Sequence, residues 1–108
     1  MPLCVLRTNL KRSSFQPDFH AIFTKYVADV LQKPTEKITL VVQTEADMSR
    51  GGSNSATVWL SIESINVFSN EKNPEIGGNL RQHLKSLLNI PENRIVVTLR
   101  DLPKADVV

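Results

Sequence analysis

The residue best suited to chemistry is Pro2, which directly follows Met1 and opens the apolar segment Leu3 to Leu6. If Met1 is removed, the chain begins with a proline whose nitrogen is a free secondary amine. A free α-amino group titrates near ~8, and burial or a nearby cation lowers its pKa because both disfavour the charged form. Such an amine can act as a base or nucleophile at neutral pH. The plainer alternative is that the proline begins an edge strand, where strands tolerate it.

Other reactive side chains are sparse. The single cysteine, Cys4, excludes an intrachain disulfide and a CxxC redox or zinc motif, so we expect a buried thiol in a reducing compartment. His20 and His83 have no carboxylate or cysteine at metal-ligand spacing. We therefore expect both histidines at surface or half-buried positions, and the sequence predicts no metal site.

Length and composition narrow the class of protein. A chain of 108 residues with 41% apolar and 22% charged residues is typical of one soluble globular domain, 1–108. Its net charge of +2 is too small to indicate nucleic-acid binding. No apolar run approaches the ~20 residues of a membrane span, and no charged-then-apolar leader precedes the first strand. We expect a cytoplasmic protein without membrane insertion.

The chain repeats itself once. At an offset of 57, Leu31, Pro34, Lys37, Ile38 and Leu40 align without gaps on Leu88, Pro91, Arg94, Ile95 and Val97. The match continues upstream, so residues 1–50 and 57–108 each read as one unit.

Apolar spacing predicts a strand, a helix and a strand in each unit. In the first unit these are strand Leu3–Thr8, a helix from Phe19 to about Gln32, and strand Ile38–Val42. In the second they are strand Thr57–Ile65, a helix capped by Asn73 that starts at Pro74 and ends at Leu88, and strand Ile95–Leu99.

Right-handed crossovers place both helices on the same face of a shared sheet. The predicted fold is therefore an α/β two-layer sandwich of two pseudo-symmetric βαβ units, with a four-stranded mixed sheet. We expect the other face to be apolar enough to be covered by further subunits, through Cys4, Leu6, Val41, Val58 or Trp59, and Val96.

These features together resemble the macrophage migration inhibitory factor and D-dopachrome tautomerase family of the tautomerase superfamily. The resemblance covers nearly the whole chain and rests on the order and spacing of Met1-Pro2, Thr8-Asn9, Lys33-Pro34, Gly51-Gly52-Ser53 and Ser64-Ile65. It implies a homotrimer around a central channel, with an active site at each subunit boundary. The implied activity is cofactor-free keto–enol tautomerisation of a small aromatic keto acid, of phenylpyruvate or dopachrome type.

The resemblance also implies roles for individual residues. Pro2 is the catalytic base, and Lys33 binds the substrate carboxylate or carbonyl oxygen while helping to keep the Pro2 amine unprotonated. The main-chain N–H of Ile65 positions the substrate, with Ser64 beside it. An alternative for Lys33 is that it lies in the last helical turn and stabilises the negative end of the helix dipole.

This chain differs from family members at Lys37, Val96 and Thr98. Lys37 stands where D-dopachrome tautomerase has an arginine, so it is either a second cation at the rim or a solvated charge. Val96 and Thr98 stand on the last strand where the inhibitory factor usually has a tyrosine and an asparagine that reach into the neighbouring site. The pocket thereby loses a phenol and an amide, although D-dopachrome tautomerase is also aliphatic at the first position.

Other departures concern the ends and the loops. The chain stops at Val108, where family members typically continue with a Gly-Trp-Asn-Gly-like tail, so we expect a more open site, a weaker trimer, or both. Thr57 and Leu60 replace the cysteines of the family's CxxC motif, which leaves a thiol oxidoreductase role without support. The sequence assigns no role to Arg50 or Trp59.

Two functions remain open on the sequence. The first is the tautomerase. The alternative is a catalytically weak, cytokine-like signalling protein that binds a cell-surface receptor and is secreted without a signal peptide. A purely structural trimer has no positive feature in its favour.

Overall fold

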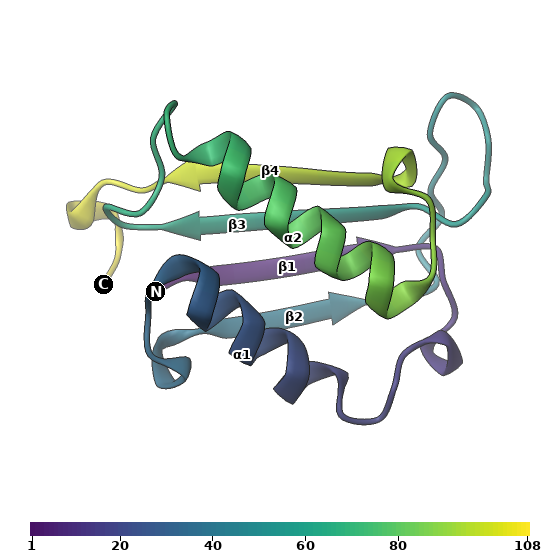
Figure 1. The fold of residues 1–108 in the computed structure, drawn as a ribbon, viewed down its shortest axis with the longest axis horizontal. Coiled ribbons are helices and arrows are strands. Elements are labelled where there is room, and N and C mark those ends of the chain that lie inside the picture. Colours follow the sequence, from purple (N-terminus) through teal and green to yellow (C-terminus); the bar gives the residue numbers. More distant parts are fainter.

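Each half of the chain folds into a strand, a helix and a second strand in the computed structural model, which describes all residues 1–108 (Figure 1). The first unit contains β1 (Leu3–Thr8), α1 (Phe19–Leu31) and β2 (Thr39–Gln43). The second unit contains β3 (Val58–Ser64), α2 (Asn73–Leu88) and β4 (Ile95–Asp101). Short 3-10 turns precede β2 and β4: η2 (Thr35–Lys37) and η3 (Glu92–Arg94).

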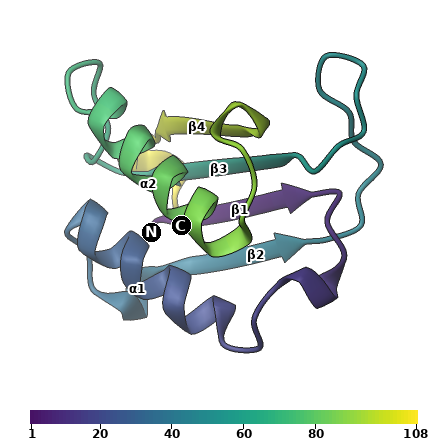
Figure 2. The same ribbon diagram turned by 45° about the vertical axis from the view of Figure 1, so that its right-hand side comes forward.

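The four strands form one sheet in the order β2-β1-β3-β4. Strands of the same unit pair in parallel, whereas β1 and β3 pair antiparallel at the centre. Both helices cover the same face of this sheet (Figure 2). The predicted two-layer sandwich with a mixed sheet is therefore confirmed, and the predicted element boundaries lie within one or two residues of the observed ones.

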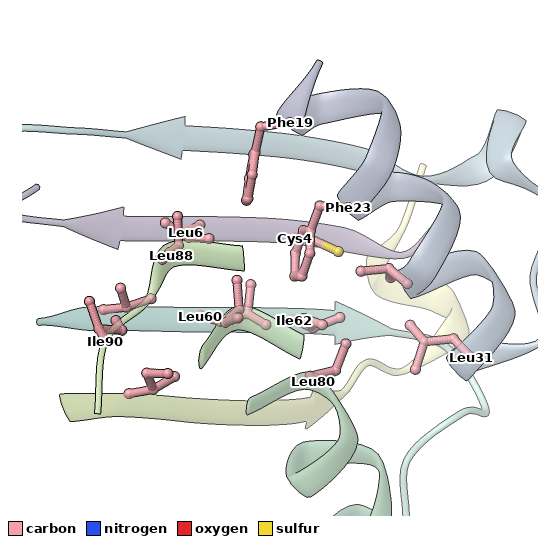
Figure 3. Close-up of a cluster of buried hydrophobic side chains, with 14 of the residues drawn as sticks. Cys4, Leu6, Phe19, Phe23, Leu31, Leu60, Ile62, Leu80, Leu88 and Ile90 are labelled. Carbon is pink, nitrogen blue, oxygen red and sulfur yellow. The ribbon is translucent and has the colours of Figure 1, made fainter. Parts of the chain in front are cut away.

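The helices bury the apolar stripes that the sequence spacing predicts. In α1 the buried side chains include Phe19, Phe23, Val27 and Leu31, which recur every four residues and so share one face. These stripes pack against fully buried residues of the central strands, among them Leu6, Leu60 and Ile62 (Figure 3). Neither helix is long and apolar enough to cross a membrane.

The expected composition of the uncovered sheet face is partly wrong. Cys4, Leu6 and Val58 are fully buried in the core between sheet and helices. The uncovered face instead carries the alternate residues of each strand, including Val41 and Trp59, which are 37% and 40% exposed. Burial also raises the pKa of the Cys4 thiol to about 12, so this cysteine stays protonated and unreactive at neutral pH.

The two units contain equivalent turns after their helices. Gln32 ends α1 and Asn89 ends α2 in the same left-handed conformation, with φ of 56° and 55°. Pro34 and Pro91 follow, and each leads through a 3-10 turn into the next strand. The turn thus fixes where the residues after α1 lie relative to the start of β2.

The start of α2 differs by one position from the prediction. Asn73 is the first helical residue and Lys72 occupies the cap position. The Asn73 side chain accepts a hydrogen bond from the Ser69 N–H instead of capping the helix from outside. The side chain therefore stabilises the turn that precedes α2.

Arg94 holds the long connection between β2 and β3. Its guanidinium donates to the carbonyl oxygens of Arg50, Ser53, Ser55 and Ala56 at 3.0 to 3.2 Å, and to Thr57 Oγ1 at 2.6 Å. A single side chain thereby links carbonyl groups along the whole segment from Arg50 to Thr57 and holds it against the start of β4. Lys37, at the equivalent place in the first unit, is exposed.

His83 lies at the contact between the two helices. Its ring stacks on Tyr26 of α1 with a centroid distance of 3.6 Å and an interplanar angle of 4°. Its Nε2 atom is buried without a hydrogen-bond partner, and burial lowers the pKa of His83.

We expect the free energy of unfolding to fall as the pH drops below about 6.5, the ordinary histidine pKa of the unfolded chain. In this range the unfolded chain binds a proton at His83 that the folded chain resists, so stability is lost on acidification. Urea unfolding at pH 7.5 and 5.5 should show a smaller loss for His83→Gln than for the wild type. The matched control is His20→Gln at an exposed position of α1. An equal loss in wild type and His83→Gln would contradict the assignment.

Candidate functional site

Pro2 occupies a fixed and buried position at the start of β1. Its side chain is fully buried, and its carbonyl oxygen accepts a hydrogen bond of 3.1 Å from the Thr39 N–H of β2. In an extended strand residue the nitrogen and the carbonyl point to the same neighbouring strand. The pairing therefore indicates that the Pro2 nitrogen faces the β2 side of the sheet.

The segment that joins α1 to β2 lies at this same end of the sheet (Figure 1), and it contains Lys33 and Lys37. Lys33 is half-buried, forms no ion pair, and follows the left-handed Gln32 with its N–H donating to the Ala28 carbonyl at 3.0 Å. Lys33 lies one residue beyond the C-cap of α1 rather than in its last turn, which contains no basic residue. Lys37 ends η2 and is exposed.

Ser64 reaches the same end from β3. Leu3 pairs with Glu63, so continuing this register places Pro2 opposite Ser64. Both side chains are fully buried, and the Ser64 hydroxyl has no hydrogen-bond partner. A buried hydroxyl without a partner is costly, which makes its position next to Pro2 notable.

The main chain after Ser64 is held by β4. The Ser64 carbonyl accepts from the Leu102 N–H at 2.9 Å, and Asn66, at φ 56°, donates its N–H to Asp101 Oδ1 at 3.0 Å. Ile65 between them is half-buried. Sequence reasoning missed Asp101 because the pattern of neither segment indicates contact across 35 residues.

Val96 and Thr98 do not join this cluster within one subunit. Val96 pairs with Trp59, which pairs with Arg7, five residues along β1 from Pro2. Thr98 Oγ1 accepts a hydrogen bond of 2.9 Å from the Trp59 indole, and the Arg7 guanidinium lies 5.0 Å from the ring centroid. Trp59, which the sequence left unassigned, therefore orders the uncovered face around Thr98.

One end of the sheet holds four of the predicted site residues, which are Pro2, Lys33, Ser64 and Ile65. Neither Pro2 nor Lys33 lines any of the five principal hollows of the isolated chain. No group of three or more histidine, cysteine, aspartate or glutamate side chains is placed to hold a metal ion. This end of the sheet therefore combines the buried Pro2 with the half-buried Lys33, which forms no ion pair.

Asp101→Ala should loosen the segment beside Pro2. Removing the acceptor leaves the Asn66 N–H unpaired, and we expect a loss of about 1 kcal/mol in the free energy of unfolding. Amide hydrogen exchange at Asn66 should accelerate in Asp101→Ala and much less in Asp101→Asn, which keeps a side-chain oxygen. Equal exchange rates in both variants would show that this contact does not hold the turn.

Comparisons with known proteins identify the family and agree with the fold. The family described as macrophage migration inhibitory factor (MIF) matches residues 1–108. The chain is 32% identical over 107 residues to the macrophage migration inhibitory factor of Xenopus laevis, covering 99% of this chain and 93% of that protein. It is 31% identical over 98 residues to D-dopachrome decarboxylase-B of Xenopus laevis, covering 90% and 83%. The structure of the macrophage migration inhibitory factor from Trichinella spiralis matches with a TM-score of 0.94 at 27% identity, covering 98% of this chain and 94% of that one. The resemblance drawn from the sequence is thus confirmed, and the chain belongs to the macrophage migration inhibitory factor family.

Proposed function

We propose that the protein is a cofactor-free keto–enol tautomerase of phenylpyruvate or dopachrome type, with Pro2 as its general base. The observation that carries the proposal is the placement of Pro2: fully buried, hydrogen-bonded to β2, and at the same end of the sheet as the half-buried Lys33. The family includes tautomerase and decarboxylase enzymes, which supports this class of reaction.

Removal of Met1 converts the Pro2 nitrogen into a secondary amine. The neutral amine takes a proton from the carbon beside the substrate carbonyl. The electron pair of that C–H bond forms the new carbon–carbon double bond, and the π pair of the carbonyl moves to its oxygen. The protonated Pro2 amine then returns its proton to that oxygen, which gives the enol. Burial of Pro2 and the positive charge of Lys33 both favour the neutral amine. No redox step or cofactor takes part.

Lys33 and Ile65 position the substrate in this proposal. The Lys33 ammonium forms no ion pair within the chain and is free to bind a carboxylate. The Ile65 N–H donates no hydrogen bond within the chain, so it is free to bind the substrate oxygen. Lys37, more exposed, adds a second positive charge at the edge of the site, and Ser64 lies beside Ile65 with a hydroxyl that has no partner within the chain.

Val96 and Thr98 belong to the site only through a neighbouring subunit, so we propose a homotrimer with a site at each boundary. Their side chains lie on the uncovered sheet face, away from the Pro2 of their own chain. Thr98 is already engaged by Trp59, which limits its freedom to bind substrate.

Pro2→Ala should lower kcat/KM for phenylpyruvate or a dopachrome ester by at least ~100-fold, the contribution expected of a general base. The variant replaces a secondary amine in a rigid ring by a flexible primary amine. Mass spectrometry confirms Met1 removal in both proteins, and circular dichroism confirms an unchanged fold. Turnover equal to wild type in the trimmed variant would exclude Pro2 as the base.

Lys33→Ala should lower kcat/KM for phenylpyruvate by roughly 10- to 100-fold, mainly through KM, because a charge-assisted hydrogen bond is worth about 1.5–3 kcal/mol. Lys37→Ala is the matched control, and we expect it to change kcat/KM by less than about threefold since the side chain is exposed. The reverse order of effects would move the anion site to Lys37.

A cytokine-like role is the second candidate. Relatives carry the name macrophage migration inhibitory factor, and the pocket strand carries Val96 and Thr98, with the Thr98 hydroxyl bound to Trp59. We propose a cytoplasmic protein that reaches a cell-surface receptor by non-classical secretion. Binding of the Pro2→Ala variant to receptor-bearing cells as tightly as wild type would make this role independent of turnover.

A further inference from the structure

A hollow lies at the opposite end of the sheet from Pro2. It has a volume of about 180 Å³ and lies between the 3-10 turn η1 (Arg12–Ser14), the start of α1 and the end of β2. Its lining includes Phe15, Phe19, Val42, Arg12, His20 and Thr44. Neither Pro2 nor Lys33 contributes to it, so it plays no part in the proposed tautomerase site.

The inner wall of this hollow is aromatic. The rings of Phe15 and Phe19 meet edge to face with their centroids 4.8 Å apart, and Phe19 is buried. Apolar cavities of roughly 150 Å³ in proteins bind benzene. A hollow of 180 Å³ with this wall therefore has the size and surface for one aromatic ring.

The rim is positively charged. Arg12 and His20 both line the hollow, and neither forms an ion pair, since the one ion pair of the protein joins Arg81 to Glu92. Lys11 beside Arg12 is exposed and adds to the positive field. Asp18 is exposed at the cap position of α1, makes no capping hydrogen bond and does not line the hollow. An unpaired guanidinium beside an aromatic wall favours a ligand that is both aromatic and anionic.

We infer that this hollow binds small aromatic carboxylates, with the ring against Phe15 and Phe19 and the carboxylate paired with Arg12. The ring enters the apolar part, where burial of its surface drives binding. The carboxylate stays at the rim, where the exposed Arg12 side chain can donate two parallel hydrogen bonds. This site goes beyond the proposed tautomerase activity and requires no turnover.

The test is an NMR titration of ¹⁵N-labelled wild-type protein with phenylacetate. We expect saturable amide shift changes in residues 13–20 and 42–44, weaker binding of the neutral phenylacetamide, and no saturation with acetate. Arg12→Gln should lower the affinity for phenylacetate about tenfold or more, since it removes a charge-assisted hydrogen bond. Arg12 is exposed, so the variant should fold, and Arg100→Gln on the uncovered sheet face is the matched control.

Lys33→Ala separates this site from the proposed active site. Shift changes in residues 13–20 that persist with unchanged affinity in Lys33→Ala support the second site. Saturable changes confined to the neighbourhood of Lys33 and Ile65, or none at all, would overturn it. Binding in residues 13–20 that Arg12→Gln leaves unchanged would overturn the assignment of the carboxylate to Arg12.

Discussion

The antiparallel pairing of β1 with β3 is the contact on which the rest of the structure depends. Each βαβ unit alone is a two-stranded parallel sheet under one helix, which is too small to bury its own apolar face. Pairing β1 with β3 joins the two units into one sheet and brings Leu6, Leu60 and Ile62 into a common core beneath both helices. The same pairing brings the start of β1 to the end of β3, and so places Pro2 opposite Ser64.

The turn that ends α1 determines which other residues lie at the Pro2 end of the sheet. Gln32 adopts the left-handed conformation that ends α1, so the chain turns back toward the sheet and delivers Lys33 and η2 beside the start of β2. Since β2 pairs with β1 in parallel, its first residue lies next to the first residue of β1. Main-chain geometry thereby places Lys33, which follows a helix, and Pro2, which precedes a strand, at the same end of the sheet.

The sequence predicted the bounds of the helices and strands well, but it predicted poorly which face of the sheet each strand residue occupies. Helical spacing of large apolar residues is unambiguous in α1, where polar residues fill the other face. In β1 the run Leu3 to Leu6 is apolar at every position, so alternation cannot show which side faces the helices. Only the register with β3 settles that Cys4 and Leu6 point inward. The hydrogen bond from Asn66 to Asp101 and the carbonyl contacts of Arg94 were not predictable, because they join segments that share no periodic pattern.

The separation of Val96 from Pro2 has a structural consequence. Through Trp59, Val96 is level with Arg7, which lies five residues along β1 from Pro2. At about 3.3 Å per residue, Val96 and Pro2 are roughly 16 Å apart along the strand direction. Val96 also lies two strands away from β1. Side chains cannot bridge that distance, so a site that uses both residues must take them from different subunits. A single chain places the buried Pro2 and the half-buried Lys33 at one end of its sheet. Its Val96 lies on the uncovered face, toward the opposite end of the sheet. In the homotrimer that we propose, the uncovered face of a second copy supplies Val96 and Thr98 to the Pro2 end of the first.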